Sequence, residues 1–151
     1  MKILTFGNFD FIHPGHIHYL EFAKKQGQKL YTVIASDEIS QQIKQRKNIF
    51  NQQQRIKQIK SLKISDKVLK GSNKNPFKIL IQIKPDIIVL GYDQKAPIKN
   101  IKALLPKCKI LRAPEFKSHV FKSLLKSLSH SVPFWLSSFF FGGDWYQHTS
   151  F

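Results

Sequence analysis

His13 and His16, near the N-terminus, are the residues whose types and spacing point most clearly to chemistry. They lie in the stretch FGNFDFIHPGHIHY, which runs from Phe6 to Tyr19. Imidazole groups can be neutral or charged near pH 7, which suits donors that stabilise charge developing on a phosphate. We therefore predict that His13 and His16 are catalytic residues acting on a reacting phosphate group.

The backbone around these histidines also suits a phosphate. Pro14 fits the first turn of a helix, where an N–H would have no intrahelical partner. Gly15 has no Cβ and lets a ligand approach the backbone. The first amides of a helix point outward at the positive end of its dipole, so they form an anion site. We expect a helix to begin near Gly15 with phosphate at its N-terminus.

Two other interpretations of this stretch stay open. A turn rich in Gly, Pro, Asn and Asp between a strand and a helix is ordinary in α/β proteins. The histidines at positions 13, 16 and 18 also suggest a metal site, although no Cys or carboxylate completes a ligand set nearby. The full order of strand, Gly-x-Phe-Asp, His-x-Gly-His and helix is more specific than any single residue, and it favours a nucleotide site.

The neighbouring elements predict how the motif is positioned. An apolar run predicts a strand over Lys2–Phe6, and apolar spacing predicts a helix over Gly15–Gln26 that ends at Gly27. Residues of high β propensity predict a second strand over Lys29–Ala35. These elements form a βαβ unit, so the sheet should be parallel with a right-handed crossover. Ligands bind beyond the carboxyl ends of such strands, where the His13–His16 loop lies.

The rest of the chain continues this alternation. Further helices are expected over 37–43, 52–62, 77–83 and 98–105, and further strands over 68–69, 87–90 and 109–112. The predicted fold class is α/β: a single Rossmann-like domain with a parallel sheet of about five strands and helices on both faces.

Cations cluster after the helix expected to end at Ile43, in the run Lys44-Gln45-Arg46-Lys47. Such a run can be only a solvated helix end, where the dipole favours cations. The functional alternative is a clamp on the β- and γ-phosphates of a triphosphate, made by Lys44, Arg46 or Lys47.

A second polar segment, Gly91-Tyr92-Asp93-Gln94, follows the apolar run Ile87–Leu90. A continuous apolar run between Pro and Gly is typical of a central parallel strand, so this segment also lies on the ligand side. A turn would explain the Gly and the Asp. Tyr92 additionally offers a flat apolar face, and Gln94 offers an amide able to read a base edge.

The motif Gly7-x-Phe9-Asp10-x-x-His13-x-Gly15-His16 resembles the signature of the cytidylyltransferase-like nucleotidyltransferases, over about residues 1–126. The resemblance implies that a nucleoside monophosphate passes from a nucleoside triphosphate to a phosphorylated small-molecule acceptor, with release of pyrophosphate and with Mg²⁺ as cofactor. The nucleotide-binding residues expected are Phe6, Gly7, Asn8, Phe9, Asp10, Gly15, Lys44, Arg46, Lys47, Gly91, Tyr92, Asp93, Gln94, Arg112 and Ser123.

Two segments resemble archaeal-type FAD synthases within that family. Gly91–Gln94 is similar to the Gly-Tyr-Asp-Gln of that group, whereas glycerol-phosphate enzymes tend to have Gly-Asp-Asp-Trp. Arg112 precedes a helix start that often reads Lys-Ser-Ser in the group. Here it is Lys122-Ser123-Leu124, which lacks one hydroxyl, and Lys117-Ser118 is an alternative match. The resemblance implies ATP and FMN as substrates, with a glycerol-3-phosphate cytidylyltransferase or similar enzyme as the alternative.

One more arginine, Arg55, lies in the helix expected over 52–62. The family commonly has an arginine at the matching place, in a Glu-x-Arg context, but here Gln53 and Gln54 precede it. The other interpretation is an arginine on the solvent face of the helix.

The composition favours an anionic partner. The 25 basic and 9 acidic residues give a formal net charge of +16, which attracts nucleoside triphosphates, nucleic acids or acidic membranes. A basic nucleic-acid-binding module is therefore the alternative of another class. The lysines are spread through every segment with few aromatic residues among them, so we expect no specific nucleic-acid partner. We also expect a homodimer.

Cysteine usage and hydropathy bear on the compartment. The single cysteine, Cys108, excludes an internal disulfide and fits a reducing compartment. The start of the chain does not resemble a signal peptide, and no run approaches the ~20 apolar residues of a spanning helix. A cytoplasmic location is therefore expected.

The last residues differ from the rest in composition. All the Lys and Arg residues precede Ser127, and both tryptophans follow it. We predict a nucleotidyltransferase domain over 1–126 and an aromatic tail over 127–151. The tail's apolar centre is too short to span a bilayer. A cover for a dimer partner, a membrane-surface contact and a non-native end all stay open as explanations.

Overall fold

A five-stranded parallel sheet is the centre of the molecule. The computed structural model describes residues 1–44 and 47–116. The strand order is β3-β2-β1-β4-β5, and every neighbouring pair is parallel. The strands are β1 (Lys2–Gly7), β2 (Lys29–Ile34), β3 (Lys67–Lys70), β4 (Ile87–Leu90) and β5 (Lys109–Arg112). The predicted α/β class and parallel sheet are confirmed.

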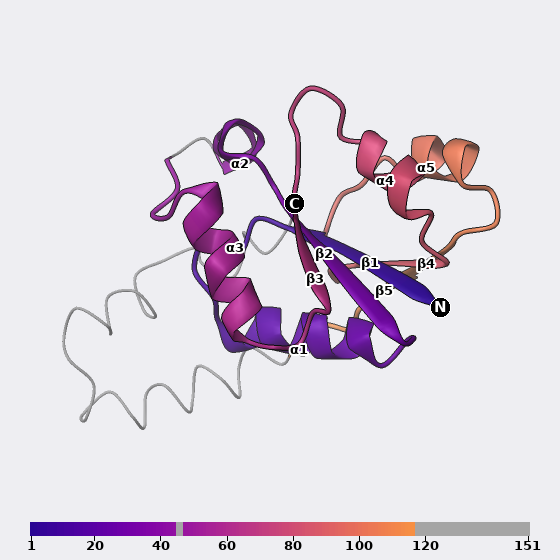
Figure 1. The fold of residues 1–151 in the computed structure, drawn as a ribbon, viewed down its shortest axis with the longest axis horizontal. Helices are drawn as coiled ribbons and strands as arrows, with labels where there is room; N and C mark the ends of the chain where they lie inside the picture. The colour runs from indigo at the N-terminus through magenta and orange to yellow at the C-terminus, as the bar shows by residue number, and fades with distance from the viewer. Residues whose placement is uncertain (45–46, 117–151) are drawn as a thin grey trace.

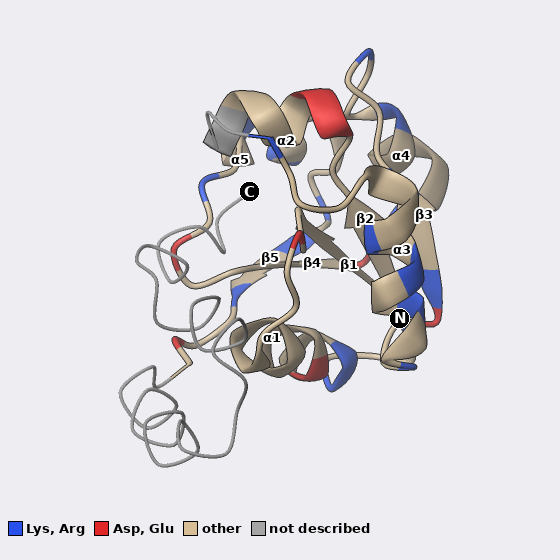
Figure 2. Ribbon diagram, turned by 90° about the vertical axis from the view of Figure 1, so that its left-hand side faces the viewer, with Lys and Arg blue, Asp and Glu red and all other residues tan. Residues whose placement is uncertain are grey.

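Helices cover both faces of this sheet. They are α1 (Pro14–Lys24), α2 (Asp37–Lys44), α3 (Gln52–Ser61), α4 (Lys78–Ile83) and α5 (Ile98–Leu104). Figures 1 and 2 show α1 on one side of the strands and α4 and α5 on the other. One apolar cluster joins the sheet to α1 and α3, and a second joins it to α4 and α5.

The central strands contribute side chains to both apolar clusters. Ile3 and Leu4 are adjacent in β1 and fully buried, yet Ile3 belongs to the α1–α3 cluster and Leu4 to the α4–α5 cluster. Successive side chains of a strand point to opposite faces, so a strand covered on both sides needs apolar residues throughout. This requirement explains the unbroken apolar run that predicted β4.

The strand order reverses between β1 and β4, which creates a crevice at their carboxyl ends. The Tyr19 hydroxyl spans this crevice from α1. It donates a 2.6 Å hydrogen bond to the Val89 carbonyl of β4 and lies 3.4 Å from the Phe6 carbonyl of β1. Burial raises the pKa of this hydroxyl far above the usual range of tyrosine, so it stays a donor. Tyr19 thereby fixes α1 against both strands.

The ends of α1 differ from the prediction. The helix begins at Pro14 and ends at Lys24, so Gly27 does not cap it. A Cβ at Gly27 would lie 2.7 Å from Cδ1 of Ile3. The glycine is therefore needed for close packing against β1 and not for terminating the helix.

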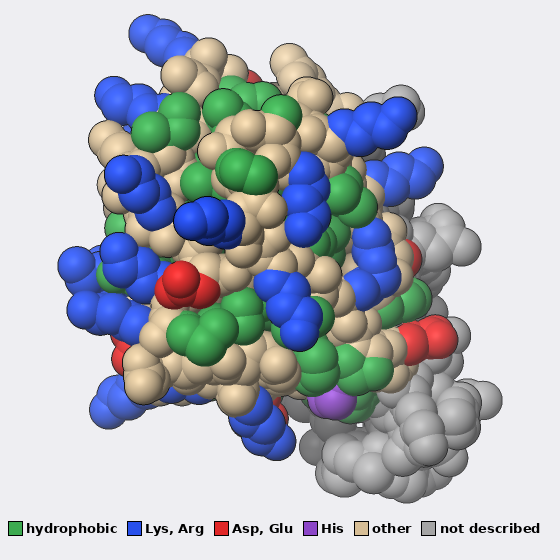
Figure 3. Space-filling model, turned by 90° about the vertical axis from the view of Figure 1, so that its right-hand side faces the viewer, with side chains coloured by type: hydrophobic (Ala, Val, Ile, Leu, Met, Phe, Trp, Pro, Cys, Tyr) green, Lys and Arg blue, Asp and Glu red, His purple; other side chains and the backbone are tan. Residues whose placement is uncertain are grey.

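Positive charge is spread over the surface. On the face that Figure 3 turns to the viewer, Lys and Arg side chains are scattered widely and acidic ones are few. This distribution agrees with the even spacing of lysines along the chain. Within residues 1–44 and 47–116, no helix has the length and hydropathy needed to cross a bilayer.

Candidate active site at the carboxyl ends of β1 and β4

His13 and His16 form the N-terminal cap of α1. Nδ1 of His13 accepts a 3.0 Å hydrogen bond from the amide of Gly15, and Nδ1 of His16 accepts a 3.3 Å bond from the amide of His13. A neutral imidazole that accepts through Nδ1 carries its proton on Nε2. Each ring is therefore a donor through Nε2 at the positive end of the helix.

Gly15 is required for the placement of His13. A Cβ at position 15 would lie 2.8 Å from Cε1 of the His13 ring. The absence of a Cβ therefore leaves room for the histidine ring. A role in admitting a ligand stays a prediction.

The two imidazoles stack on each other, and Phe9 supports them. Their centroids lie 3.8 Å apart, and the Phe9 ring meets the His16 ring edge-on at 5.1 Å. Phe9 is 3% exposed and adopts a left-handed backbone with φ of 52°. That conformation folds its ring back over Gly7, where an added Cβ would lie 2.1 Å from Phe9 Cε2. Gly7 is therefore needed to seat the ring that holds His16.

The change Gly7→Ala is expected to lower the free energy of unfolding by about 1–3 kcal/mol, because it overfills the space under the Phe9 ring. Denaturant unfolding measures this cost. In a Phe9→Leu background, the same change should cost less, because a smaller side chain relieves the clash. An equal cost in both backgrounds would show that the Phe9 ring is not what excludes a Cβ.

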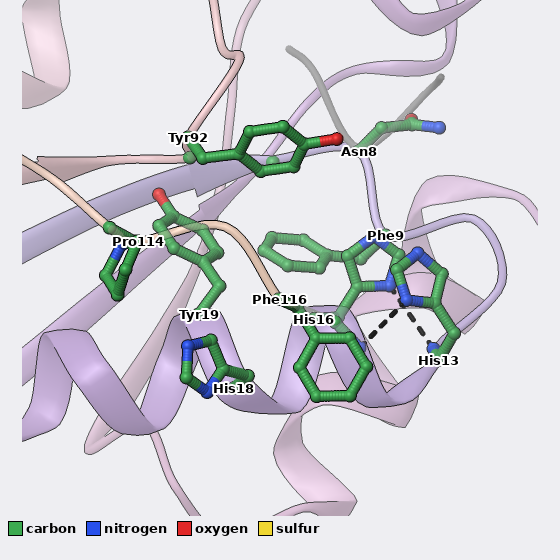
Figure 4. A pocket seen from close by; sticks show the side chains of 13 residues that line it. Asn8, Phe9, His13, His16, His18, Tyr19, Tyr92, Pro114 and Phe116 are labelled. Atoms are coloured by element: carbon green, nitrogen blue, oxygen red, sulfur yellow. Dashed lines mark hydrogen bonds between the residues drawn. The ribbon is translucent and has the colours of Figure 1, made fainter. Parts of the chain in front are cut away.

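A cavity of about 70 Å³ opens beside the histidines. Residues from the ends of β1, β4 and β5 and from α1 line it: Gly7, Asn8, Phe9, His13, Gly15, His16, His18, Tyr19, Gly91, Tyr92, Ala113, Pro114 and Phe116. Figure 4 shows the histidine pair at one side of this hollow, with Tyr92, His18 and Phe116 around the remainder. The cavity thus brings the predicted motif and the predicted Gly91–Tyr92 segment together.

His18 is a lining residue that the sequence suggested only as a metal ligand. Its ring lies 5.6 Å from the Phe116 ring. Its Nε2 is buried and has no hydrogen-bond partner within the described part of the chain. A buried polar atom without a partner is costly, so this nitrogen is suited to a ligand group in the cavity.

The carboxylate of Asp10 binds backbone amides of a distant segment of the chain. It is 3% exposed and accepts 2.9 Å hydrogen bonds from the amides of Ile49 and Phe50. The side chain of Asn8 also contacts this segment, donating to Asn48 at 3.3 Å. The loop after β1 therefore holds the segment 48–50, which directly follows the basic run in the sequence.

Arg55 is not on the solvent face of α3, so that interpretation was wrong. Its side chain is fully buried, and its guanidinium donates to the Asn8 carbonyl and to Oδ1 of Asn8, each at 2.9 Å. It also donates to the Phe50 carbonyl at 3.2 Å and forms a 2.7 Å ion pair with Asp37. Arg55 therefore connects the loop after β1 to α2 and to the segment at position 50.

The segment after β4 is held by the side chains of Gln94 and of Arg112 in β5. Gln94 is 2% exposed, and its side-chain oxygen accepts from the Gly91 amide at 2.9 Å. Arg112 donates to the carbonyls of Gly91 and Gln94 at 2.7 and 2.8 Å. These contacts use the Gln94 amide for the turn and do not support its predicted contact with a base edge. Arg112 likewise contacts the backbone of this turn.

Tyr92 is the member of this turn that stays accessible. It is 38% exposed and lines the cavity. Partial burial, and then the negative charges of Asp93 and Glu115, raise the pKa of its hydroxyl. Its neutral ring can therefore stack on a ligand, as the sequence suggested.

Some predicted site residues fall elsewhere. Lys47 is exposed, and Lys44 is the last residue of α2. Phe6, one residue before the end of β1, lines a different cavity from the histidines. Arg46 and Ser123 lie outside the described residues, as do the Lys117-Ser118 match and the tail over 127–151. Within the described ranges, no group of three or more His, Cys, Asp or Glu residues could hold a metal ion.

Comparisons with known proteins identify the family of this chain. A family model described as Cytidylyltransferase-like matches residues 4–132. The FAD synthase of Methanohalophilus mahii is 42% identical over 106 residues, which cover 70% of this chain and 73% of that protein. The FAD synthase of Picrophilus torridus is 44% identical over 94 residues, which cover 62% of this chain and 67% of that protein.

A solved structure is similar over most of this chain. The lipopolysaccharide core biosynthesis protein from Thermoplasma volcanium GSS1 has a TM-score of 0.71 and 35% identity, covering 78% of this chain and 98% of that one. The range matched by the family model includes the histidine-capped helix α1 and most of the five-stranded sheet. The chain therefore belongs to the cytidylyltransferase-like family, and it is a nucleotidyltransferase.

Proposed function

We propose that the chain is an FMN adenylyltransferase, which joins ATP and FMN to give FAD and pyrophosphate. The observation that carries the proposal is the pair of imidazole donors at the N-terminus of α1, in a chain 42% identical to a FAD synthase. A glycerol-3-phosphate cytidylyltransferase or similar enzyme is the competing assignment.

In the proposed reaction, a phosphate oxygen of FMN attacks the α-phosphorus of ATP in line, and pyrophosphate leaves. The protein forms no covalent intermediate, so it contributes positioning and charge stabilisation. Nε2 of His13 and of His16 would donate to the α-phosphate as charge develops. The run 44–47 would hold the β- and γ-phosphates. Mg²⁺ would enter on the triphosphate oxygens, because the described residues offer no ligand cage of their own.

The cavity beside the histidines would bind the nucleoside. Its volume of about 70 Å³ is well below the roughly 300 Å³ of a small ligand pocket, so it encloses only part of a nucleotide. The base would enter among Tyr92, His18 and Phe116, and the phosphates would lie over the helix terminus. Nε2 of His18 would then bind a polar edge of the base.

The change His18→Ala is expected to raise the KM for ATP by about three- to tenfold with kcat nearly unchanged, because it removes a binding contact remote from the reacting phosphorus. Steady-state kinetics at saturating FMN measures both constants. His18→Gln keeps a hydrogen-bonding group and should recover part of the affinity. A wild-type KM for His18→Ala would rule out this contact.

The substrates are tested by incubating the protein with Mg²⁺, FMN and either ATP or CTP, and separating the flavins by chromatography. FAD forming with ATP is the expected result. Turnover of glycerol 3-phosphate with CTP, without any flavin dinucleotide from either nucleotide, would replace the assignment with the competing one. Salt-sensitive binding to arbitrary DNA without pyrophosphate release would favour the nucleic-acid module.

Three further parts of the proposal concern organisation. The catalytic domain would span 1–126, the active form would be a homodimer, and the enzyme would work in the cytoplasm. The family model, which extends over 4–132, supports a single domain of about this length.

A further inference from the structure

A second and larger cavity lies between the sheet and helices α4 and α5. Its open volume is about 370 Å³, against about 70 Å³ for the cavity beside the histidines. Apolar side chains form most of the lining, among them Phe6, Val33, Phe77, Leu80, Ala96 and Ile101. We name it the α4–α5 cavity. Its volume falls within the roughly 300–1,000 Å³ of pockets that hold small organic ligands.

The two cavities reach the same edge of the sheet from opposite faces. Phe6 lines the α4–α5 cavity, and the next residue, Gly7, lines the cavity beside the histidines. In the turn after β4, Gly91 lines the cavity beside the histidines, and Gln94 lines the α4–α5 cavity. A molecule in the α4–α5 cavity therefore lies across the ends of β1 and β4 from the nucleotide.

This arrangement suits in-line transfer between two large substrates. The attacking phosphate and the leaving pyrophosphate must lie on opposite sides of the α-phosphorus. The smaller cavity cannot enclose both a nucleoside and an acceptor. The acceptor is therefore expected to approach from the other face of the sheet, over the end of β1.

The lining selects the kind of acceptor. The rings of Phe6 and Phe77 and the aliphatic side chains around them favour a flat apolar group. Polar residues including Ser36, Ser72 and Asn75 also line the cavity and suit the polar edge of such a ring. A small polyol phosphate would leave this apolar surface without a partner.

We propose that the α4–α5 cavity binds the isoalloxazine ring of the acceptor, with the ribityl phosphate chain crossing the end of β1 to reach His13 and His16. This inference rests on the proposed function, because it assigns the flavin of that reaction to a particular cavity.

Filling the cavity tests the inference by binding, independently of catalysis. Ala96 is half-buried in the loop before α5, and Ala96→Trp would occupy the space of the ring. Ala103 on α5 is exposed and does not line the cavity, so Ala103→Trp is the matched control. Ser72→Trp is a second blocking variant at an exposed lining position, where folding is not at risk.

Flavin fluorescence would be titrated with each variant, using FMN and riboflavin as probes, with and without α,β-methylene ATP. Ala96→Trp and Ser72→Trp should weaken the binding of both probes by about tenfold or more, while Ala103→Trp leaves it unchanged. Binding of the ATP analogue should be unchanged in all three. Riboflavin is included because it has the ring without the phosphate.

The outcomes separate this inference from the proposed function. If folded Ala96→Trp and Ser72→Trp proteins bind FMN as the wild type does, while the wild type makes FAD, the cavity assignment is overturned and the reaction stands. If the wild type binds both flavins through this cavity but forms no FAD, the reaction fails and the cavity assignment stands. If the wild type binds neither flavin, even with the ATP analogue, the cavity assignment is overturned.

Discussion

Replacing His16 by alanine is expected to lower kcat by about 10²–10³ while changing the KM for ATP much less. Its Nε2 is placed to donate at the N-terminus of α1, where charge would develop on the α-phosphate. Removing one such donor typically costs this much, because the interaction is stronger in the transition state than in the ground state. The same range is expected for His13→Ala. Single-turnover rates with ATP and FMN measure the effect.

The cap that these histidines form could complicate the result, so a capping control is needed. Asparagine is a good N-cap residue but lacks the Nε2 donor. His13→Asn should therefore keep the stability of α1, measured by denaturant unfolding, and still lose turnover. Wild-type turnover in either alanine variant would exclude that histidine from the chemistry.

The substitution Arg55→Ala is expected to lower the free energy of unfolding by about 3 kcal/mol. It removes a fully buried side chain and leaves the carbonyls of Asn8 and Phe50 without their donor. Its ion pair with Asp37 adds less, because that carboxylate side chain is 51% exposed. The loop at Asn8 should also lose its position, so kcat should fall as well.

An exposed cation on the same helix provides the control. Lys57→Ala should change stability by no more than about 0.5 kcal/mol, as surface substitutions usually do. Arg55→Lys keeps the charge but cannot make the divergent contacts of a guanidinium, so it should recover only part of the loss. Equal stabilities of Arg55→Ala and Lys57→Ala would show that the buried contacts do not support the fold.

The parts of the fold that depend on local pattern could be predicted from the sequence. The continuous apolar runs of β1 and β4 follow from burial on both faces, and β5 was predicted with the bounds observed. The helix terminus at His13–His16 could be predicted because its signals, a proline, a glycine and two histidines, lie within four consecutive residues. Its start differed by one residue, because His13 itself is the cap.

The contacts that could not be predicted join residues far apart in the chain. Asp10 binds amides at positions 49 and 50, and Arg55 binds the loop at Asn8. One local contact was also not predicted. Gln94 was expected to contact a base, but its side chain accepts from the Gly91 amide of its own turn, and that contact depends on how the turn folds. The α4–α5 cavity depends on how two short helices lie over the sheet, which no motif encodes.

A signal for the burial of Arg55 was nevertheless present. The buried positions of α3 are Gln52, Arg55, Ile56 and Ile59, which follow the spacing i, i+3, i+4, i+7 of one helix face. An arginine in register with two isoleucines is a candidate for inward contacts. Periodicity shows only the face, however, and the three segments that this guanidinium joins become visible only in the structure.

The central claim is that the chain transfers an adenylyl group at the histidine-capped terminus of α1. The most direct test follows radioactive phosphorus placed at either the α- or the γ-position of ATP during incubation with FMN. The label should pass from the α-position into the flavin dinucleotide, and from the γ-position into pyrophosphate, in equal amounts. Both transfers should be about 10²–10³ slower in His16→Ala. Label entering a flavin from the γ-position, or α-label transfer that is unaffected by His16→Ala, would contradict the claim.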